Sequence, residues 1–288
     1  MDLKRYTTPD DFYRHAERFL AAHEAENNLP IGICTTRLAQ PERIEPDMYL
    51  ATVEDDGEIV LAALRTPPYD VVLSLMPRRD LAASAIAPLV ADVRAVYADR
   101  VPGVIGPSHE SQLFGELWGQ ETGQTVVPFM QERIYRLESV VSVTGVPGYL
   151  RRASHEDRDL LIRWSDAFNA EAHTSAASDS AAWADQALTS PARAVYFWVD
   201  SEPVTMVGRG GFTPHGARIG PVYTPPEQRR HGYASACTAA VSQLELDSGR
   251  RFCFLFTNLA NPTANHIYQT IGYRAVCDAE VYHFRERA

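Results

Sequence analysis

The sequence contains few cysteines and no closely spaced cysteine pair. Its 288 residues include Cys34, Cys237, Cys253 and Cys277, which are widely separated, and no C-x-x-C motif. A zinc site of the usual spacing is therefore not expected, and no metal site is predicted. A disulfide framework is equally unexpected at this density of cysteine. Reduced thiols in a cytosolic protein fit this pattern best.

An excess of basic charge and a long hydrophobic run are also missing. The formal net charge is −10, whereas a nucleic-acid-binding domain is normally basic, so no nucleic-acid partner is expected. No apolar run approaches the roughly 20 residues of a membrane-spanning helix. The first residues also lack the apolar core of a signal peptide. The sequence predicts a soluble, cytoplasmic protein with no membrane partner.

What the sequence does contain is the pattern of two folded domains. Hydrophobic residues make up 45% and charged residues 22%, as in globular proteins, and the length suits one large domain or two ordinary ones. A turn-rich stretch, residues 143–148, separates two series of periodic segments. Helices are predicted over 9–25, 81–97, 110–119, 155–172, 180–189, 233–247 and 262–271. Strands are predicted over 48–53, 58–64, 71–75, 104–106, 134–137, 194–199, 205–212, 218–223, 252–257 and 276–284.

Both series run helix, strands, helix, strand, helix, strand. We therefore predict two α/β domains, residues 1–145 and 146–288, and interpret the repeat as an internal duplication. The alternative is that any two α/β domains look alike at this level of detail.

The most informative segment is GPVYTPPEQRRHGYAS, residues 220–235. It predicts a strand, a proline-rich turn and the start of a helix, where free backbone N–H groups can hold an anion. Gly232 and Ala234 are small enough for a pyrophosphate to approach the backbone. The nucleotide-binding motifs G-x-G-x-x-G and G-x-x-x-x-G-K-[ST] do not occur here. Taken alone, an R-x-x-G-x-A segment is also compatible with a tight turn carrying solvated arginines.

Two motifs together give the segment a family resemblance. Arg229, Gly232 and Ala234 resemble the acetyl-CoA signature R/Q-x-x-G-x-G/A of the GNAT superfamily of N-acetyltransferases, with Pro226 three residues before the arginine. Residues 257–273, TNLANPTANHIYQTIGY, resemble the later family motif N-x-x-A/S-x-x-[L/I]-Y-x-x-x-G-[F/Y]. The motifs occur in the family order with a helix and a strand between them. The resemblance covers about half of the chain.

The resemblance implies a fold and a cosubstrate. The fold would be two tandem GNAT-like domains, each a mixed, mostly antiparallel central sheet flanked by helices, with the first domain degenerate. Acetyl-CoA would bind the second domain. Its pantetheine arm would pair with the backbone of Val222, Tyr223 and Thr224. Its pyrophosphate would be held by the amides of the turn, which are those of Arg229, Arg230, His231, Gly232, Tyr233 and Ala234.

The second motif supplies two further site residues. Tyr268 matches the family tyrosine that often protonates the departing thiolate. A phenol with a pKa of about 10 stays protonated at neutral pH and can donate. The alternative for Tyr268 is a half-buried packing residue. Asn261 can cap the following helix, and the resemblance implies that it contacts the coenzyme; both roles are compatible.

The implied activity is transfer of an acetyl group from acetyl-CoA to an amine by direct attack in a ternary complex. The acceptor would be a small-molecule or peptide amine, and the protein a monomer or homodimer. The general base is not evident, and the weak candidates are Asp166, Glu171 and His173. Trp183, Tyr196 and Trp198 either line an acceptor pocket or belong to the core. The alternative function is a non-catalytic acyl-CoA-binding sensor or regulatory protein.

The first half lacks the coenzyme signature. No R-x-x-G-x-G/A occurs before residue 145, and the corresponding segment after strand 71–75, MPRRDLAASA, contains no glycine. A GNAT-like first domain would therefore have lost coenzyme binding. The alternative is an unrelated α/β domain.

Overall fold

The computed structural model describes residues 1–40, 47–172 and 179–287. They form two compact units. Unit 1 contains Met1–Ile134, Phe256–Asn261 and the segment from Ala275 onwards, and unit 2 contains Tyr135–Leu255 and Pro262–Arg274. These units are defined by proximity and include separate stretches of chain, so the division predicted at residues 145 and 146 stays a prediction. Within the described ranges, no helix is long and apolar enough to cross a membrane.

Unit 1 is built on a mostly antiparallel sheet. Its strands lie in the order β1-β2-β3-β4-β5-β12, and β4 and β5 are the parallel pair. These strands are β1 (Asp2–Arg5), β2 (Tyr49–Asp55), β3 (Glu58–Arg65), β4 (Val71–Leu73), β5 (Gly103–Pro107) and β12 (Arg274–Arg285). A further strand, β6 (Thr125–Leu137), belongs to unit 1 up to Ile134 and to unit 2 from Tyr135. The helices are α1 (Pro9–Ala21), α2 (Asn28–Ala39), α3 (Ala82–Tyr97) and α4 (Ser108–Thr122).

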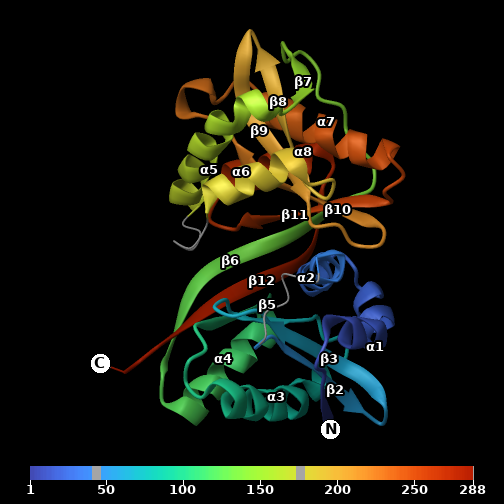
Figure 1. Ribbon diagram of the computed structural model, residues 1–288, viewed down its shortest axis with the longest axis vertical. Helices are drawn as coiled ribbons and strands as arrows, with labels where there is room; N and C mark the ends of the chain where they lie inside the picture. The colour runs from blue at the N-terminus through green and yellow to red at the C-terminus, as the bar shows by residue number, and fades with distance from the viewer. Residues whose placement is uncertain (41–46, 173–178, 288) are drawn as a thin grey trace. The chain divides into compact units, whose positions relative to one another are not determined.

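Helices cover both faces of this sheet (Figure 1). Leu50 of β2 packs in a core with α1 and α2. Its neighbours Tyr49 and Ala51 pack in a second core with α3 and α4. This alternation follows from the period of two in a strand, which sends successive side chains to opposite faces. Because both faces are covered, β2 is buried almost throughout.

Unit 2 repeats this plan. Its strands lie in the order β11-β10-β9-β8-β7, and β10 and β11 are the parallel pair. The strands are β7 (Tyr149–Arg152), β8 (Ala194–Asp200), β9 (Glu202–Gly210), β10 (Gly216–Tyr223) and β11 (Phe252–Asn258). The helices are α5 (Arg158–Ala172), α6 (Ser180–Thr189), α7 (Tyr233–Asp247) and α8 (Pro262–Ile271).

The two faces of the second sheet are again covered by different helix pairs. Phe197 of β8 packs in a core with α5 and α6, whereas the adjacent Tyr196 packs in a core with α7 and α8. Each half of the chain thus runs strand, two helices, three strands, helix, strand, helix, strand. This shared order supports the predicted duplication and confirms the predicted fold class.

Most predicted elements are confirmed, and three were missed. The bounds predicted for α6, α7 and α8 are those observed. The missed elements are β1, α2 and β7. β1 and β7 have four residues each and include charged side chains, so their strand character depends on pairing: Lys4 of β1 donates to Glu54 of β2 at 2.6 Å. α2 contains Pro30 and Gly32, which usually indicate a loop, but Pro30 lies in the first turn, where a missing N–H costs little.

Candidate active site

Strand β10 leads into the predicted anion-binding turn and contains a β-bulge. Its register against β9 shifts by one residue between Ile219 and Val222. Gly220 lies at the shift with φ +135°, a conformation that favours glycine. A Cβ atom on Gly208 of β9 would lie 2.6 Å from the Gly220 carbonyl oxygen, so the bulge also needs a glycine facing it. A bulge bends its strand, and bulges are frequent beside active sites.

Beyond the bulge, β10 and β11 no longer pair. Their parallel pairing covers the first three residues of β10 and, within the described chain, does not continue beyond Arg218. Thr205 of β9 donates a hydrogen bond of 2.8 Å from Oγ1 to the Tyr223 carbonyl, which therefore points toward β9. Successive residues direct their backbone groups to opposite sides of a strand, so those of Val222 and Thr224 point away from β9. Of these groups, the Thr224 carbonyl already accepts a hydrogen bond of 2.9 Å from Arg229 Nε.

The turn between β10 and α7 contains one backbone amide that is already bonded: the Arg229 N–H, predicted to help hold the pyrophosphate, donates to the Pro226 carbonyl at 3.3 Å. Residues 229–232 are exposed, and Arg230 and Gly232 adopt positive φ angles of +68° and +83°. Intrahelical bonding of α7 begins with the Ala236 N–H, which donates to the Gly232 carbonyl at 3.0 Å. The amides of residues 233–235 therefore have no acceptor within the helix. With the positive end of the helix dipole beside them, these amides suit a pyrophosphate.

Arg229 links the turn to α5. Its Nε donates to the Thr224 carbonyl at 2.9 Å, and its Nη2 donates to both carboxylate oxygens of Glu171, at 2.7 and 2.8 Å. The guanidinium thus holds the turn in place, while the backbone amides, Arg230 and His231 face solvent. Glu171, one of the three candidates for the general base, is engaged in this ion pair.

A second contact at the start of α7 was not predicted from the sequence. Tyr233 donates its hydroxyl proton to Asp200 of β8 at 2.6 Å, and this hydrogen bond raises the pKa of Tyr233. The ring of His231 stacks on Tyr233 with centroids 5.5 Å apart. Asp200 and Thr205 lie on strands far from the motif in sequence, so only the pairing of β8, β9 and β10 reveals them.

Tyr268 lies in α8 and is 8% exposed. Its ring is 6.4 Å from that of Tyr135 and 6.0 Å from that of Tyr273. Burial raises the pKa of Tyr268 to about 12. Within the described part of the chain, its hydroxyl makes no hydrogen bond, whereas Tyr135 donates to Asn265 at 2.9 Å and the Tyr273 hydroxyl is 2.8 Å from that of Ser242. Tyr268 is therefore a protonated phenol with its donor still available.

The other predicted residues lie in several places. Asn261 directly precedes α8 and is exposed, as is Asp166 of α5, while His173 lies outside the described residues. The aromatic candidates for an acceptor pocket, Trp183, Tyr196 and Trp198, are partners of the two cores of unit 2. The indole of Trp198 donates to the Pro147 carbonyl at 2.7 Å. All three side chains thus pack in the cores, and Tyr196 also lines a cavity of unit 2.

In unit 1, side chains of the protein bond the backbone amides after β4, the strand that corresponds to β10. The pairing of β4 with β5 is confined to two residue pairs. Beyond it, the Leu75 N–H donates to Asn27 Oδ1 at 2.8 Å and the Met76 N–H donates to Glu110 Oε1 at 2.7 Å. Asn27 and Glu110 are 1% and 0% exposed. The amides of Leu75 and Met76, directly after β4, are therefore already bonded by side chains of unit 1.

Two positions in helices α4 and α8 account for part of the difference between the two units. Counted from the first residue of each helix, Glu110 in α4 corresponds to Ala264 in α8, and Phe114 corresponds to Tyr268. The first half thus has a carboxylate where the second has a methyl group, and it lacks the phenol.

Comparisons with known proteins agree with this geometry. The family model described as "FR47-like protein" matches residues 199–283. A GCN5-related N-acetyltransferase from Sphaerobacter thermophilus has a similar structure, with a TM-score of 0.63, 17% identity and coverage of 98% of this chain and 94% of that one. A GNAT-family acetyltransferase from Colwellia psychrerythraea gives a TM-score of 0.59 at 10% identity, covering both chains completely. A tandem GNAT protein from the clavulanic acid biosynthesis pathway gives 0.56 at 14% identity, covering 99% and 98%.

This chain has the GNAT acetyltransferase fold. The match to a tandem GNAT protein extends over both halves, so the first half also has a GNAT-like fold. The family model covers the bulged strand, the turn and α8 of the second half. No curated protein sequence matches the chain.

Proposed function

We propose that the protein is an acetyl-CoA-dependent N-acetyltransferase whose coenzyme site lies in the second GNAT half. The observation that carries this proposal is the bulged strand β10, which leaves β11 and ends in a turn with free amides before α7. A strand with unpaired backbone groups suits the amides of a pantetheine arm. The helix start beside it suits a pyrophosphate.

The proposed reaction is attack of a neutral amine on the bound thioester in a ternary complex. When bound, acetyl-CoA supplies an acetyl group activated as a thioester. Backbone groups of Val222 and Thr224 would orient the arm, and an N–H of this strand would polarise the carbonyl as charge develops. The amine proton would leave to a carboxylate, a histidine or a water molecule.

Tyr268 would assist the leaving sulfur. Its pKa of about 12 is above the value of about 8.5 for a thiol, so complete transfer of its proton to a thiolate would be unfavourable by about 5 kcal/mol. A hydrogen bond from the phenol to the developing thiolate has no such cost. We therefore assign Tyr268 the role of a hydrogen-bond donor that stabilises the thiolate.

A route through an acyl-cysteine is disfavoured. Cys237 and Cys253, in α7 and β11, are both 0% exposed, and burial raises the pKa of both thiols, that of Cys253 to about 12. The thiolate is the nucleophilic form, so neither side chain is suited to attack a thioester.

The test combines binding with turnover. Calorimetry of the full chain with acetyl-CoA should show binding, and release of the coenzyme thiol should accelerate when an accepted amine from a mixed panel is added. No binding of acetyl-CoA would overturn the assignment of the turn. Binding without acceleration by any amine would instead favour the second candidate, a non-catalytic acyl-CoA sensor.

One observation supports that second candidate. Among the described candidates no dedicated base is evident, because Glu171 is paired with Arg229 and Asp166 is exposed to solvent. Slow hydrolysis of the coenzyme that is unaffected by amines would be its signature.

A further inference from the structure

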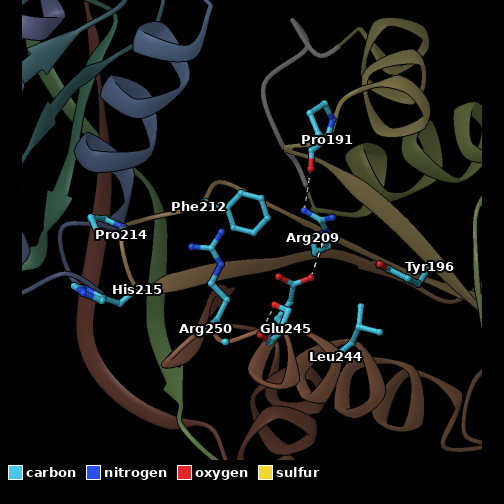
Figure 2. A pocket seen from close by; sticks show the side chains of 11 residues that line it. Pro191, Tyr196, Arg209, Phe212, Pro214, His215, Leu244, Glu245 and Arg250 are labelled. Atoms are coloured by element: carbon cyan, nitrogen blue, oxygen red, sulfur yellow. Dashed lines mark hydrogen bonds and ion pairs between the residues drawn. The ribbon is translucent and has the colours of Figure 1, made fainter.

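Unit 2 contains a cavity at the opposite end of β10 and α7 from the coenzyme turn (Figure 2). It has a volume of about 540 Å³ and is formed by the β9–β10 loop and the C-terminal end of α7. The coenzyme turn precedes α7, and a helix of 15 residues spans about 22 Å. The cavity is therefore separate from the proposed coenzyme site, and its size is in the range of small-molecule sites.

Two guanidinium groups are held together in this cavity by one aromatic ring. The Cζ atom of Arg209 lies 5.0 Å from the centroid of the Phe212 ring, and that of Arg250 lies 4.4 Å from it. Arg209 donates to the Pro191 carbonyl at 3.3 Å and Arg250 to the Thr213 carbonyl at 3.3 Å. A guanidinium has five N–H donors, so each arginine retains donors that can reach a ligand.

Arg209 has a buried donor without an acceptor. Its Nε is buried and, within the described residues, makes no hydrogen bond. The nearest carboxylate atom, Oε1 of Glu245, is 3.3 Å away, an ion pair without hydrogen-bond geometry. The side chains of Arg209 and Glu245 are 15% and 6% exposed. A buried N–H without an acceptor is costly, and such a group often indicates a missing partner.

The charge of the cavity suits a monoanion. Two arginines face one buried carboxylate, Glu245, and the remaining single positive charge is partly offset by the negative end of the α7 dipole. His215 adds a further basic side chain at the rim. This local excess of positive charge contrasts with the net charge of −10 of the whole chain. A polyphosphate would require more positive charge than the cavity holds.

The apolar residues that line the cavity indicate the chemistry of the uncharged part of the ligand. Tyr196 and Leu244 line the cavity beside the two arginines and offer apolar surface. A planar carboxylate matches the fork of a guanidinium. We propose that this cavity binds a small organic monocarboxylate, with its carboxylate held by Arg209 and Arg250 and its apolar body against Tyr196 and Leu244. This site does not depend on the proposed acetyl transfer.

The first arm of the test uses the unmodified full chain and needs no variant. Calorimetry is performed with benzoate, with benzamide as its uncharged isostere, and with inorganic phosphate. Benzoate should bind, and benzamide should bind at least about tenfold more weakly, because it cannot accept two charge-assisted hydrogen bonds. Equal binding of benzoate and benzamide, no binding of benzoate at millimolar concentration, or tighter binding of phosphate would overturn the proposal.

The second arm locates the site. Arg250→Gln should weaken benzoate binding at least about tenfold, whereas Arg251→Gln, the same change one residue further on, should leave it unchanged. Both variants are first checked for an unchanged melting temperature, and Arg250→Lys replaces Arg250→Gln if the latter does not fold, with the same loss expected because an ammonium lacks the planar fork. Equal affinity of the Arg250 and Arg251 variants for benzoate would show that its carboxylate does not bind in this cavity.

Discussion

Gly232 combines two constraints that make it a sensitive residue. Its φ of +83° favours glycine, and a Cβ atom there would lie 2.9 Å from Val146 Cγ2. It also lies at the N-cap of α7, where the proposed pyrophosphate would bind. A substitution at this position tests both the backbone conformation and the charge of the site.

We expect Gly232→Glu to weaken acetyl-CoA binding by more than about a hundredfold. A like charge about 4 Å from a phosphate costs about 4 kcal/mol near a protein surface. Calorimetry measures the loss. Gly249→Glu is the matched control, since Gly249 also has a positive φ, +97°, and lies at the other end of α7. Equal affinities in the two variants would remove the turn from the coenzyme site.

We expect Tyr268→Phe to lower kcat by about a hundredfold or less, the low end of the range for positioned proton donors. The ring and its packing against Tyr135 and Tyr273 are preserved, so coenzyme affinity should be nearly unchanged. Tyr273→Phe removes a hydroxyl that is bonded to Ser242 and should instead reduce stability. Single-turnover rates and melting temperatures distinguish the two effects. Wild-type turnover by Tyr268→Phe would refute its role.

The pKa of about 12 for Tyr268 has a consequence for the pH profile. The phenol remains protonated up to about pH 11, so its donor function should persist across pH 7–10. The ratio of wild-type to Tyr268→Phe kcat should therefore be constant over that interval. A ratio that falls toward one near pH 10 would mean that the phenol ionises much earlier.

At the scale of elements, the two halves of the chain share an order but differ at the end of one strand. In unit 2 the bulge in β10 frees backbone groups that β11 would otherwise bond. In unit 1 the amides after β4 are bonded by Asn27 and Glu110, and burial raises the pKa of Glu110. The same fold thus presents one open strand end and one closed by its own side chains.

We therefore expect one acetyl-CoA per chain. Calorimetry of the full-length protein should give a stoichiometry near one, and Gly232→Glu should remove that binding without revealing a second site. A stoichiometry of two, or residual tight binding in Gly232→Glu, would show that the first half also binds the coenzyme.

At the scale of the whole molecule, the last strand completes the first unit. β12 pairs with β5 from Ala279↔Pro107 to His283↔Gly103. The ring of Phe284 stacks on Trp118 with centroids 5.2 Å apart and lies 6.4 Å from Phe114. The core formed by residues of the first half therefore depends on the final residues of the chain.

We expect Phe284→Ala to lower the free energy of unfolding by about 3–5 kcal/mol, the usual cost of removing a core phenylalanine. Denaturant unfolding, followed by tryptophan fluorescence, measures the change. Phe129→Ala is the matched control, because Phe129 is 42% exposed and stacks on the neighbouring His283. Equal losses in both variants would show that β12 does not contribute to this core.

The sequence by itself determined the periodic elements, the α/β pattern of both halves and the segment that we propose as an anion-binding turn. These features are local: the helices α6, α7 and α8 follow from spacing and caps, and the turn from residues 229–234 follows from glycine, proline and the helix start. The GNAT-like fold of the second half followed from two motifs in a fixed order, and the tandem arrangement followed from the repeated order of elements.

Tertiary structure decided the geometry of the candidate site and of its counterpart in unit 1. Both depend on contacts between residues that are distant in sequence. Strand pairing shows that β10 bulges opposite Gly208. Side-chain contacts between distant segments show that Arg229 bonds Glu171 and that Asn27 and Glu110 bond the amides after β4. Short, charged strands such as β1 have no apolar period of their own and form because a neighbour offers hydrogen bonds. The cavity of Arg209 and Arg250 could not be predicted from the sequence either. The two arginines are 41 residues apart in the chain, and both guanidinium groups pack on the ring of Phe212.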